Sequence, residues 1–166
     1  MRTIITLSAA AIMLGACGGT DEGTIETENG ETVAYEVEGD GGDTSIRISG
    51  DDGEEMVINS GGGTNVDLPD GYSIYPGATV VSSTTMNQND GQGTLVIMQS
   101  DASAKDMVAF YRNQAESAGI KIQMEMSTNG SEMIGGESDR GGTFSFNATP
   151  SEGGTTAQLV VGQGLN

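Results

Sequence analysis

Few side chains in this sequence offer a chemistry beyond charge and hydrogen bonding. Histidine is absent, and Cys17 is the only thiol among the 166 residues. This composition excludes the usual histidine and cysteine ligand sets for zinc and the histidine-activated serine and cysteine nucleophiles. It also excludes any disulfide bond within the chain. The remaining candidates are thioethers, carboxylates and the single thiol.

The thioethers stand out at Met124 and Met126, which flank one glutamate. Paired thioethers are soft ligands that suit Cu(I). The same two residues also continue the alternation of Ile120 and Ile122, which predicts a strand with one buried face. We therefore expect the methionines to fill the core, as methionine often does, and we keep a copper site as the alternative.

Two acidic, glycine-rich turns raise the possibility of a calcium site. Ca²⁺ takes about six to eight oxygen ligands, and two facing loops could supply several. No Asp-x-Asp-x-Asp-Gly loop is present, so solvated hairpin tips are the expected structure. The carboxylates concerned are Asp40 and Asp43 in the first turn, and Asp51, Asp52, Glu54 and Glu55 in the second.

Catalysis would have to use carboxylates alone, as glycosidases do with a pair about 5 to 9.5 Å apart. Glu125, Glu132 and Glu137 flank a predicted hairpin and are the candidates. Carboxylates on strands usually form a solvated face. The glycines at 61–63 are not followed by the Gly-Lys-Ser/Thr of a phosphate-binding loop. We expect no enzymatic activity and no cofactor, with a carboxylate-based hydrolase as the third reading of the sequence.

Cys17 follows a segment with the features of an export signal. Arg2 is basic, and residues 4–14 are predominantly apolar. The apolar run is shorter than the roughly 20 residues that a transmembrane helix needs. Small residues, Gly15 and Ala16, come directly before the cysteine.

The stretch Leu14-Gly15-Ala16-Cys17 resembles the lipobox of bacterial lipoproteins. The resemblance implies that residues 1–16 are a signal peptide and that the Cys17 thiol carries lipid, with acyl chains such as palmitate. Two or three such chains hold a protein stably on a membrane. Because Gly18 rather than Asp follows the cysteine, the resemblance implies the outer membrane, with the protein facing the periplasm.

Charge limits the partners that the chain can bind. The formal net charge is −18. Nucleic-acid binding relies on Lys and Arg at the phosphates, so we expect no nucleic-acid partner. The expected partners are the membrane, through the lipid on Cys17, and a second envelope protein.

The apolar pattern predicts an α+β fold, an antiparallel sheet with one packed helix preceded by a short β-hairpin meander. Short alternating runs predict the meander, and Ser103 is placed to cap the helix, with Asp106 three residues on. Whether the meander extends the main sheet or forms a sheet beside it is left open. Tyr35, Phe110, Phe144 and Phe146 are the predicted aromatic core residues. The predicted divisions are a signal peptide at 1–16, a lipidated tether at 17–23, a β-meander at 24–60, a linker at 61–71 and an α+β domain at 72–166.

From Tyr75 onward the chain resembles a loose group of small bacterial envelope lipoproteins. The shared features are a Tyr-Pro-Gly-Ala entry, here 75–78, and a Ser-Asp-led helix with an Ala-Phe-Tyr core, here 109–111. These motifs are structural and imply no catalytic residue. The sequence as a whole predicts a lipid-anchored, periplasm-facing, non-catalytic binding or structural module. The alternative is a lipoprotein that binds a metal, calcium or copper, or a small ligand.

Overall fold

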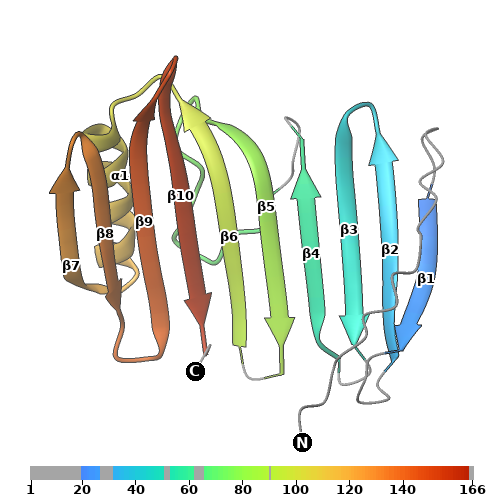
Figure 1. Ribbon diagram of the computed structural model, residues 1–166. Coiled ribbons are helices and arrows are strands. Elements are labelled where there is room, and N and C mark those ends of the chain that lie inside the picture. The colour runs from blue at the N-terminus through green and yellow to red at the C-terminus, as the bar shows by residue number, and fades with distance from the viewer. Residues whose placement is uncertain (1–19, 27–31, 51–52, 62–65, 90, 165–166) are drawn as a thin grey trace, which may run out of the picture.

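A computed structural model describes residues 20–26, 32–50, 53–61, 66–89 and 91–164. These residues form ten strands and one helix (Figure 1). The strands are β1 (Thr20–Glu26), β2 (Thr32–Asp40), β3 (Asp43–Gly50), β4 (Glu55–Ser60), β5 (Thr79–Gln88), β6 (Gly91–Ser100), β7 (Lys121–Thr128), β8 (Ser131–Glu137), β9 (Gly142–Ser151) and β10 (Gly154–Gln163), and the helix is α1 (Ala104–Ser117).

All ten strands belong to one antiparallel sheet with the order β1-β2-β3-β4-β5-β6-β10-β9-β8-β7. The predicted fold class is confirmed. The question left open by the sequence is also answered, because β4 pairs with β5 and the meander continues the main sheet. The C-terminal strand β10 lies in the middle of the sheet, between β6 and β9.

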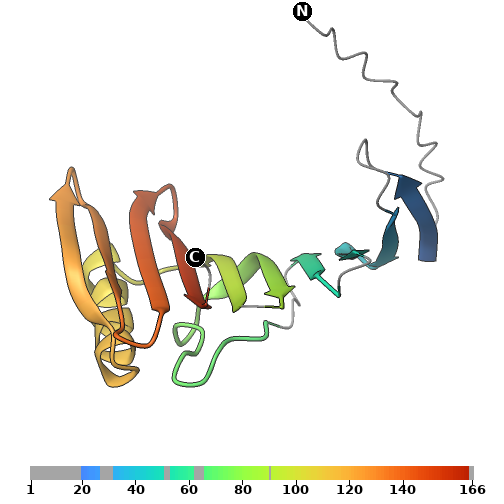
Figure 2. The same ribbon diagram turned by 90° about the horizontal axis from the view of Figure 1, so that it is seen from below.

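The second layer of the fold covers only part of one sheet face. Helix α1 contacts β7, β8 and β9, and the segment 66–78 packs beside it on the same core. Figure 2 shows both on one side of the sheet, while β1 and β2 curl towards the other side. Strands β1 to β4 therefore have no second layer among the described residues.

Helix α1 begins at the predicted Ser103 cap. The Ser103 hydroxyl accepts a hydrogen bond from the backbone N–H of Asp106 and donates one to its carboxylate, 2.7 Å away. This arrangement satisfies one of the free N–H groups of the first turn. Gly119, with φ of +84°, ends the helix in the left-handed conformation that glycine adopts readily.

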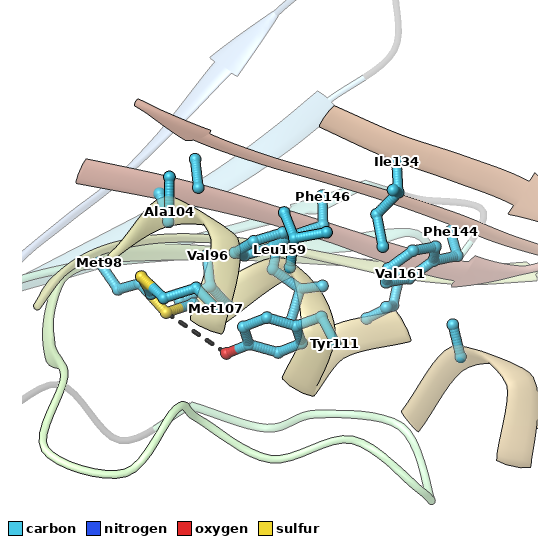
Figure 3. Packing of buried hydrophobic residues seen from close by; sticks show 14 of the residues in the cluster. Val96, Met98, Ala104, Met107, Tyr111, Ile134, Phe144, Phe146, Leu159 and Val161 are labelled. Atoms are coloured by element: carbon cyan, nitrogen blue, oxygen red, sulfur yellow. Dashed lines mark hydrogen bonds between the residues drawn. The ribbon is translucent and has the colours of Figure 1, made fainter. Parts of the chain in front are cut away.

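The core lies between α1 and strands β6, β10, β9 and β8 (Figure 3). Tyr111 is fully buried at its centre, with its ring centroid 4.3 Å from that of Phe146. Its hydroxyl donates a hydrogen bond to the Met98 sulfur at 3.3 Å, drawn dashed in Figure 3, and accepts one from the backbone N–H of Tyr75 at 3.0 Å. Tyr111 thus joins the helix to a strand and to the segment that precedes β5.

The aromatic predictions are partly right. Phe144 and Phe146 are buried. Phe110 is half-buried and packs against the rim of the core, edge-on to Tyr75 with ring centroids 5.1 Å apart. Tyr35 is half-buried on β2, outside this core.

The first strand differs from expectation. The sequence predicts a flexible tether up to residue 23, but β1 already begins at Thr20. Every residue of β1 pairs with a residue of β2, from Glu26 against Thr32 to Thr20 against Glu38. The polar, glycine-containing composition of this strand hides the pairing, because its stability comes from the backbone ladder and not from an apolar pattern.

Candidate functional site

The predicted lipidation site, Cys17, lies outside the described residues. The described residues begin three positions later, at Thr20, the first residue of β1. Within the described part, no helix is both long and apolar enough to cross a bilayer. Lipidation at Cys17 therefore stays a prediction.

The two acidic turns lie at opposite ends of β3. Asp40 and Asp43 close the β2–β3 hairpin, whereas Gly53 and Glu54 follow the other end of the same strand. A strand of eight residues spans roughly 26 Å, so the turns cannot face one another across one ion. Asp51 and Asp52 lie outside the described residues. In the described part of the chain, no three acidic, histidine or cysteine side chains gather as a metal site.

The candidate catalytic glutamates do not converge on one point. Glu125 and Glu132 lie on the face that α1 covers, and each has its own partner: Arg112 at 2.6 Å for Glu125 and the Ser127 hydroxyl at 2.8 Å for Glu132. Glu137 lies on the opposite face, since its register partner is Thr143. Glu125 and Glu132 are diagonal neighbours on one face, and Glu137 lies on the other, so the three glutamates do not share one site.

The prediction that Met124 and Met126 fill the core is wrong. The register between β7 and β8 shifts between Ile122 and Met124, which makes Gln123 an extra residue in the ladder. Such a bulge re-aims the side chains that follow it. Ile120 and Ile122 pack against the core, but Met124 and Met126 lie on the opposite face with 45% and 52% of their surface exposed.

A glycine makes this bulge possible. A Cβ atom at Gly136 would lie 2.1 Å from the backbone carbonyl oxygen of Lys121. No side chain fits that distance, so the close approach of β8 to the bulged strand requires glycine. The bulge and Gly136 together determine the face on which the methionines stand.

The sheet face opposite α1 is the most distinctive surface of the molecule, and we call it the open face. Strand pairing places on it a series of apolar side chains, interrupted by Thr84 between Ile58 and Leu95, which we call the apolar band. Two rows run across the strands in register, from Tyr35 to Met86 and from Val37 to Val160. The members of the band are Val33, Tyr35, Val37, Ile46, Ile48, Met56, Ile58, Met86, Leu95, Ile97 and Val160.

The open face carries no charge over its central strands. Among the described residues of the seven adjacent strands β2, β3, β4, β5, β6, β10 and β9, every side chain that register places on this face is uncharged. Charges stand only towards the edges, with Asp21 on β1 and Lys121 and Glu137 on β7 and β8. In a chain with 24 acidic residues, such a face is not expected from composition alone.

The other face of the meander has the opposite character. Glu22, Glu36, Arg47 and Val57 follow one another in register across β1 to β4. Arg47 also forms an ion pair with Glu55 on the neighbouring strand. Alternation along each strand thus separates the acids from the apolar side chains, which is how a sheet with one solvated face is built.

A shallow hollow of about 270 Å³ lies on the open face near its β7 edge. Its floor is formed by Gly135 and Gly136, and Met124, Ser145 and Val160 contribute to its walls. The Met124 methyl carbon lies 3.4 Å from the position that a Cβ of Gly135 would take. The absence of a side chain at Gly135 therefore creates the space.

A glycine also shapes the other edge of the open face. The Tyr35 ring lies over Gly23 of the edge strand β1, where a Cβ atom would come within 2.6 Å of the tyrosine hydroxyl. An aromatic side chain over a glycine on an edge strand fixes the register of the pair. Tyr35, predicted to be in the core, instead closes the apolar band at this edge.

On the covered side, two tyrosine hydroxyls have contrasting environments. Burial raises the pKa of Tyr111 to about 12, although the backbone N–H of Tyr75 acts against this rise. Burial also raises the pKa of Tyr72 to about 12. The Tyr72 hydroxyl is buried without a hydrogen-bond partner among the described residues, and its ring stacks on Phe144 with centroids 6.0 Å apart. Both phenols are neutral at physiological pH.

Sequence reasoning missed the open face as a unit. The alternation of Val33, Tyr35 and Val37 with Ala34 and Glu36 was visible, but it does not say on which side of the sheet the helix lies. Only the register connects these residues with Leu95 and Val160, far along the chain.

Comparison with known proteins gives one result. A family model described as START domain-like matches residues 80–156. The match extends from β5 through α1 to the beginning of β10, and it leaves out the meander. No curated protein and no solved structure matches the chain. The matched part of the chain is similar to START domain-like modules, and it contains the residues that line the hollow except Val160, together with the β5 and β6 part of the apolar band.

Proposed function

We propose that this chain is a lipid-anchored, non-catalytic binding module of the cell envelope whose open face binds a small apolar ligand. The observation that carries the proposal is the uncharged apolar band in a chain with a net charge of −18. Exposed contiguous apolar surface marks binding sites in soluble proteins. The match to a START domain-like model supports a small ligand, as does the hollow over Gly135.

The ligand class follows from the side chains of the band. Isoleucine, valine, leucine, methionine and tyrosine offer apolar contact, with few polar groups to orient a ligand. Each square ångström of apolar surface removed from water contributes about 25 cal/mol. A ligand of this site is therefore uncharged over most of its surface, and an anionic ligand is disfavoured by the acids around it.

A binding titration tests the open face directly. The full chain carrying Cys17→Ser, which removes the thiol, is titrated with Nile red, an uncharged apolar fluorophore. We expect saturable binding with a blue-shifted emission. Leu95→Glu places a charge between Thr84 and Val160 in the middle of the band, and we expect it to weaken binding by about tenfold or more, since a buried unpaired charge is costly.

Val57→Glu is the matched control. Val57 is also half-buried, and it neighbours Ile58 on β4 but lies on the opposite face. It should bind Nile red like the parent chain. Equal binding by the two glutamate variants, or no saturable binding by the folded parent, would overturn the proposal.

An envelope protein that covers the whole band is the second candidate, and the width of the band favours it. Six adjacent strands contribute side chains, which at about 4.8 Å per strand gives a width of roughly 25 Å. A photo-crosslinking residue at position 95 of the lipidated chain, irradiated on intact cells, distinguishes the two. A stoichiometric protein adduct supports the second candidate, and its absence together with Nile red binding supports the first.

The anchor has its own test. Cys17→Ser should abolish metabolic labelling with palmitate and release or mislocalise the protein, because the mature chain without acyl groups loses its lipid anchor. Ala16→Gly keeps a small residue before the cysteine and serves as the control. Retention of a fully processed Cys17→Ser variant on membranes would contradict lipid anchoring at this residue.

A further inference from the structure

Three methionines stand together at the β7 edge of the open face. Met126 is the register partner of Met133 on β8, and Met124, two residues earlier on β7, is the partner of Gly135. Met124 and Met126 are exposed and Met133 is half-buried. We call these three residues the methionine cluster.

The register brings three thioethers within reach of one point. Residues directly opposite in an antiparallel pair have Cβ atoms about 5 Å apart, and neighbours two positions along a strand are about 7 Å apart. Each methionine side chain has three rotatable bonds, so its sulfur can move through several ångströms. Three sulfurs at adjacent positions can therefore converge on one ion.

The fourth position of this group carries no side chain. Met124, Met126 and Met133 occupy three corners of a four-residue patch, and the fourth corner is Gly135. Because Gly135 has no side chain, the hollow of about 270 Å³ opens beside Met124. The hollow extends from Gly135 towards Glu137 and Thr143, and Met124 is the member of the cluster that lines it.

The surrounding side chains favour a soft cation over a hard one. The cross-strand neighbours on β9 are Ser145 and Asn147, which are uncharged. The carboxylate that lines the hollow, Glu137, stands two residues beyond Gly135 and away from Met133. Neutral sulfur ligands select Cu(I), whereas Ca²⁺ and Mg²⁺ need several oxygens. The net charge of the chain adds a general attraction for cations.

We propose that Met124, Met126 and Met133 form a Cu(I) site on the open face, with the three thioether sulfurs as ligands. Binding involves no change in oxidation state and no proton release, since thioethers carry no titratable proton. The site borders the apolar band, because Ser145 of β9 lies between Gly135 and Val160 in register, and Met124 and Val160 line the same hollow.

The full chain with Cys17→Ser is the protein for the test, because its only sulfur ligands are thioethers. Under anaerobic conditions it competes for Cu(I) with bicinchoninate, a coloured Cu(I) chelator. We expect one Cu(I) per chain. The double variant Met126→Leu/Met133→Leu keeps the size and apolar character of the residues, and we expect it to weaken Cu(I) binding by at least about tenfold.

The chain offers a matched control in Met56→Leu/Met86→Leu. These two methionines are also cross-strand partners on the open face, but they form a pair without a third thioether. Their replacement should leave Cu(I) affinity unchanged. No competition by the parent chain, or equal loss in the two double variants, would overturn the proposal.

A second measurement locates the ligands. With Ag(I), a redox-inert ion of similar preference, and methyl-labelled methionine, the ε-methyl NMR signals of Met124, Met126 and Met133 should shift. Those of Met98 and Met107, which are fully buried, should stay in place. Shifts confined to other methionines would also contradict the site.

The outcomes separate this proposal from the apolar-ligand proposal. Met126→Leu/Met133→Leu should lose Cu(I) but keep Nile red, whereas Leu95→Glu should lose Nile red but keep Cu(I). If the leucine variant loses both, the methionines belong to one apolar surface and the separate Cu(I) site is wrong.

Discussion

Tyr72 and Tyr111 show how two buried phenols can differ in their contribution to stability. The Tyr111 hydroxyl both donates and accepts, to the Met98 sulfur and from the Tyr75 backbone. In the part of the chain that the structure describes, the Tyr72 hydroxyl has no hydrogen-bond partner. A satisfied buried hydroxyl contributes roughly 1 kcal/mol, and an unsatisfied one costs about 1 to 3 kcal/mol.

Replacement of each tyrosine by phenylalanine should therefore have opposite effects. Tyr111→Phe should lower the free energy of unfolding by about 1 to 2 kcal/mol, because the Tyr75 N–H loses its acceptor. Tyr72→Phe should leave it unchanged or raise it by up to about 1 kcal/mol. Urea denaturation of the two variants beside the parent chain measures both, and equal losses would show that Tyr72 has a partner in solution.

At the scale of the element, the β-bulge at Gln123 determines which side chains of β7 lie on the open face. Residues before it, Ile120 and Ile122, belong to the core, and residues after it, Met124 and Met126, belong to the open face. The bulge occurs on an edge strand, where such irregularities are common and hinder pairing with other sheets. One extra residue thus places the apolar side chains before it on the core face and those after it on the open face of the same strand.

Cysteine accessibility tests this reversal. In the Cys17→Ser chain, Met124→Cys and Met126→Cys should react with a maleimide about tenfold or more faster than Ile122→Cys, because a buried thiol reacts only after local opening. Equal rates at 122 and 124 would mean that the strand is regular and shares one face. Val81→Cys, an exposed position on the central strand β5, gives the rate of an accessible thiol.

The elements themselves were largely readable from the sequence, because their signals are local. The Ser103 cap, the Gly119 stop and the Asn129-Gly130 turn all stand where the chain changes direction. The methionine faces were not readable, because period two predicts one face only while the ladder is regular. The open face also required the register between β4 and β5, which pairs residues across the predicted linker.

At the scale of the whole molecule, charge and apolar surface are sorted to opposite sides. The acids of the meander, such as Glu22 and Glu36, line one face, and Tyr35, Ile46 and Ile58 line the other. This sorting leaves one face charged and the other a surface that water solvates poorly. A tethered protein with such a surface is suited to collect an uncharged apolar partner near a membrane.

The single-layer construction of β1 to β4 has a kinetic consequence. Backbone amides in a layer without packing on either side open by small local fluctuations, whereas those under α1 open only when the core unfolds. Hydrogen–deuterium exchange should therefore be fast in β2 and β3 and slow in β9 and β10, which lie under the core. A molecule bound on the apolar band would cover the meander and slow this exchange. The exchange rate of β2 and β3, near the proposed tether, would therefore show whether a ligand is bound.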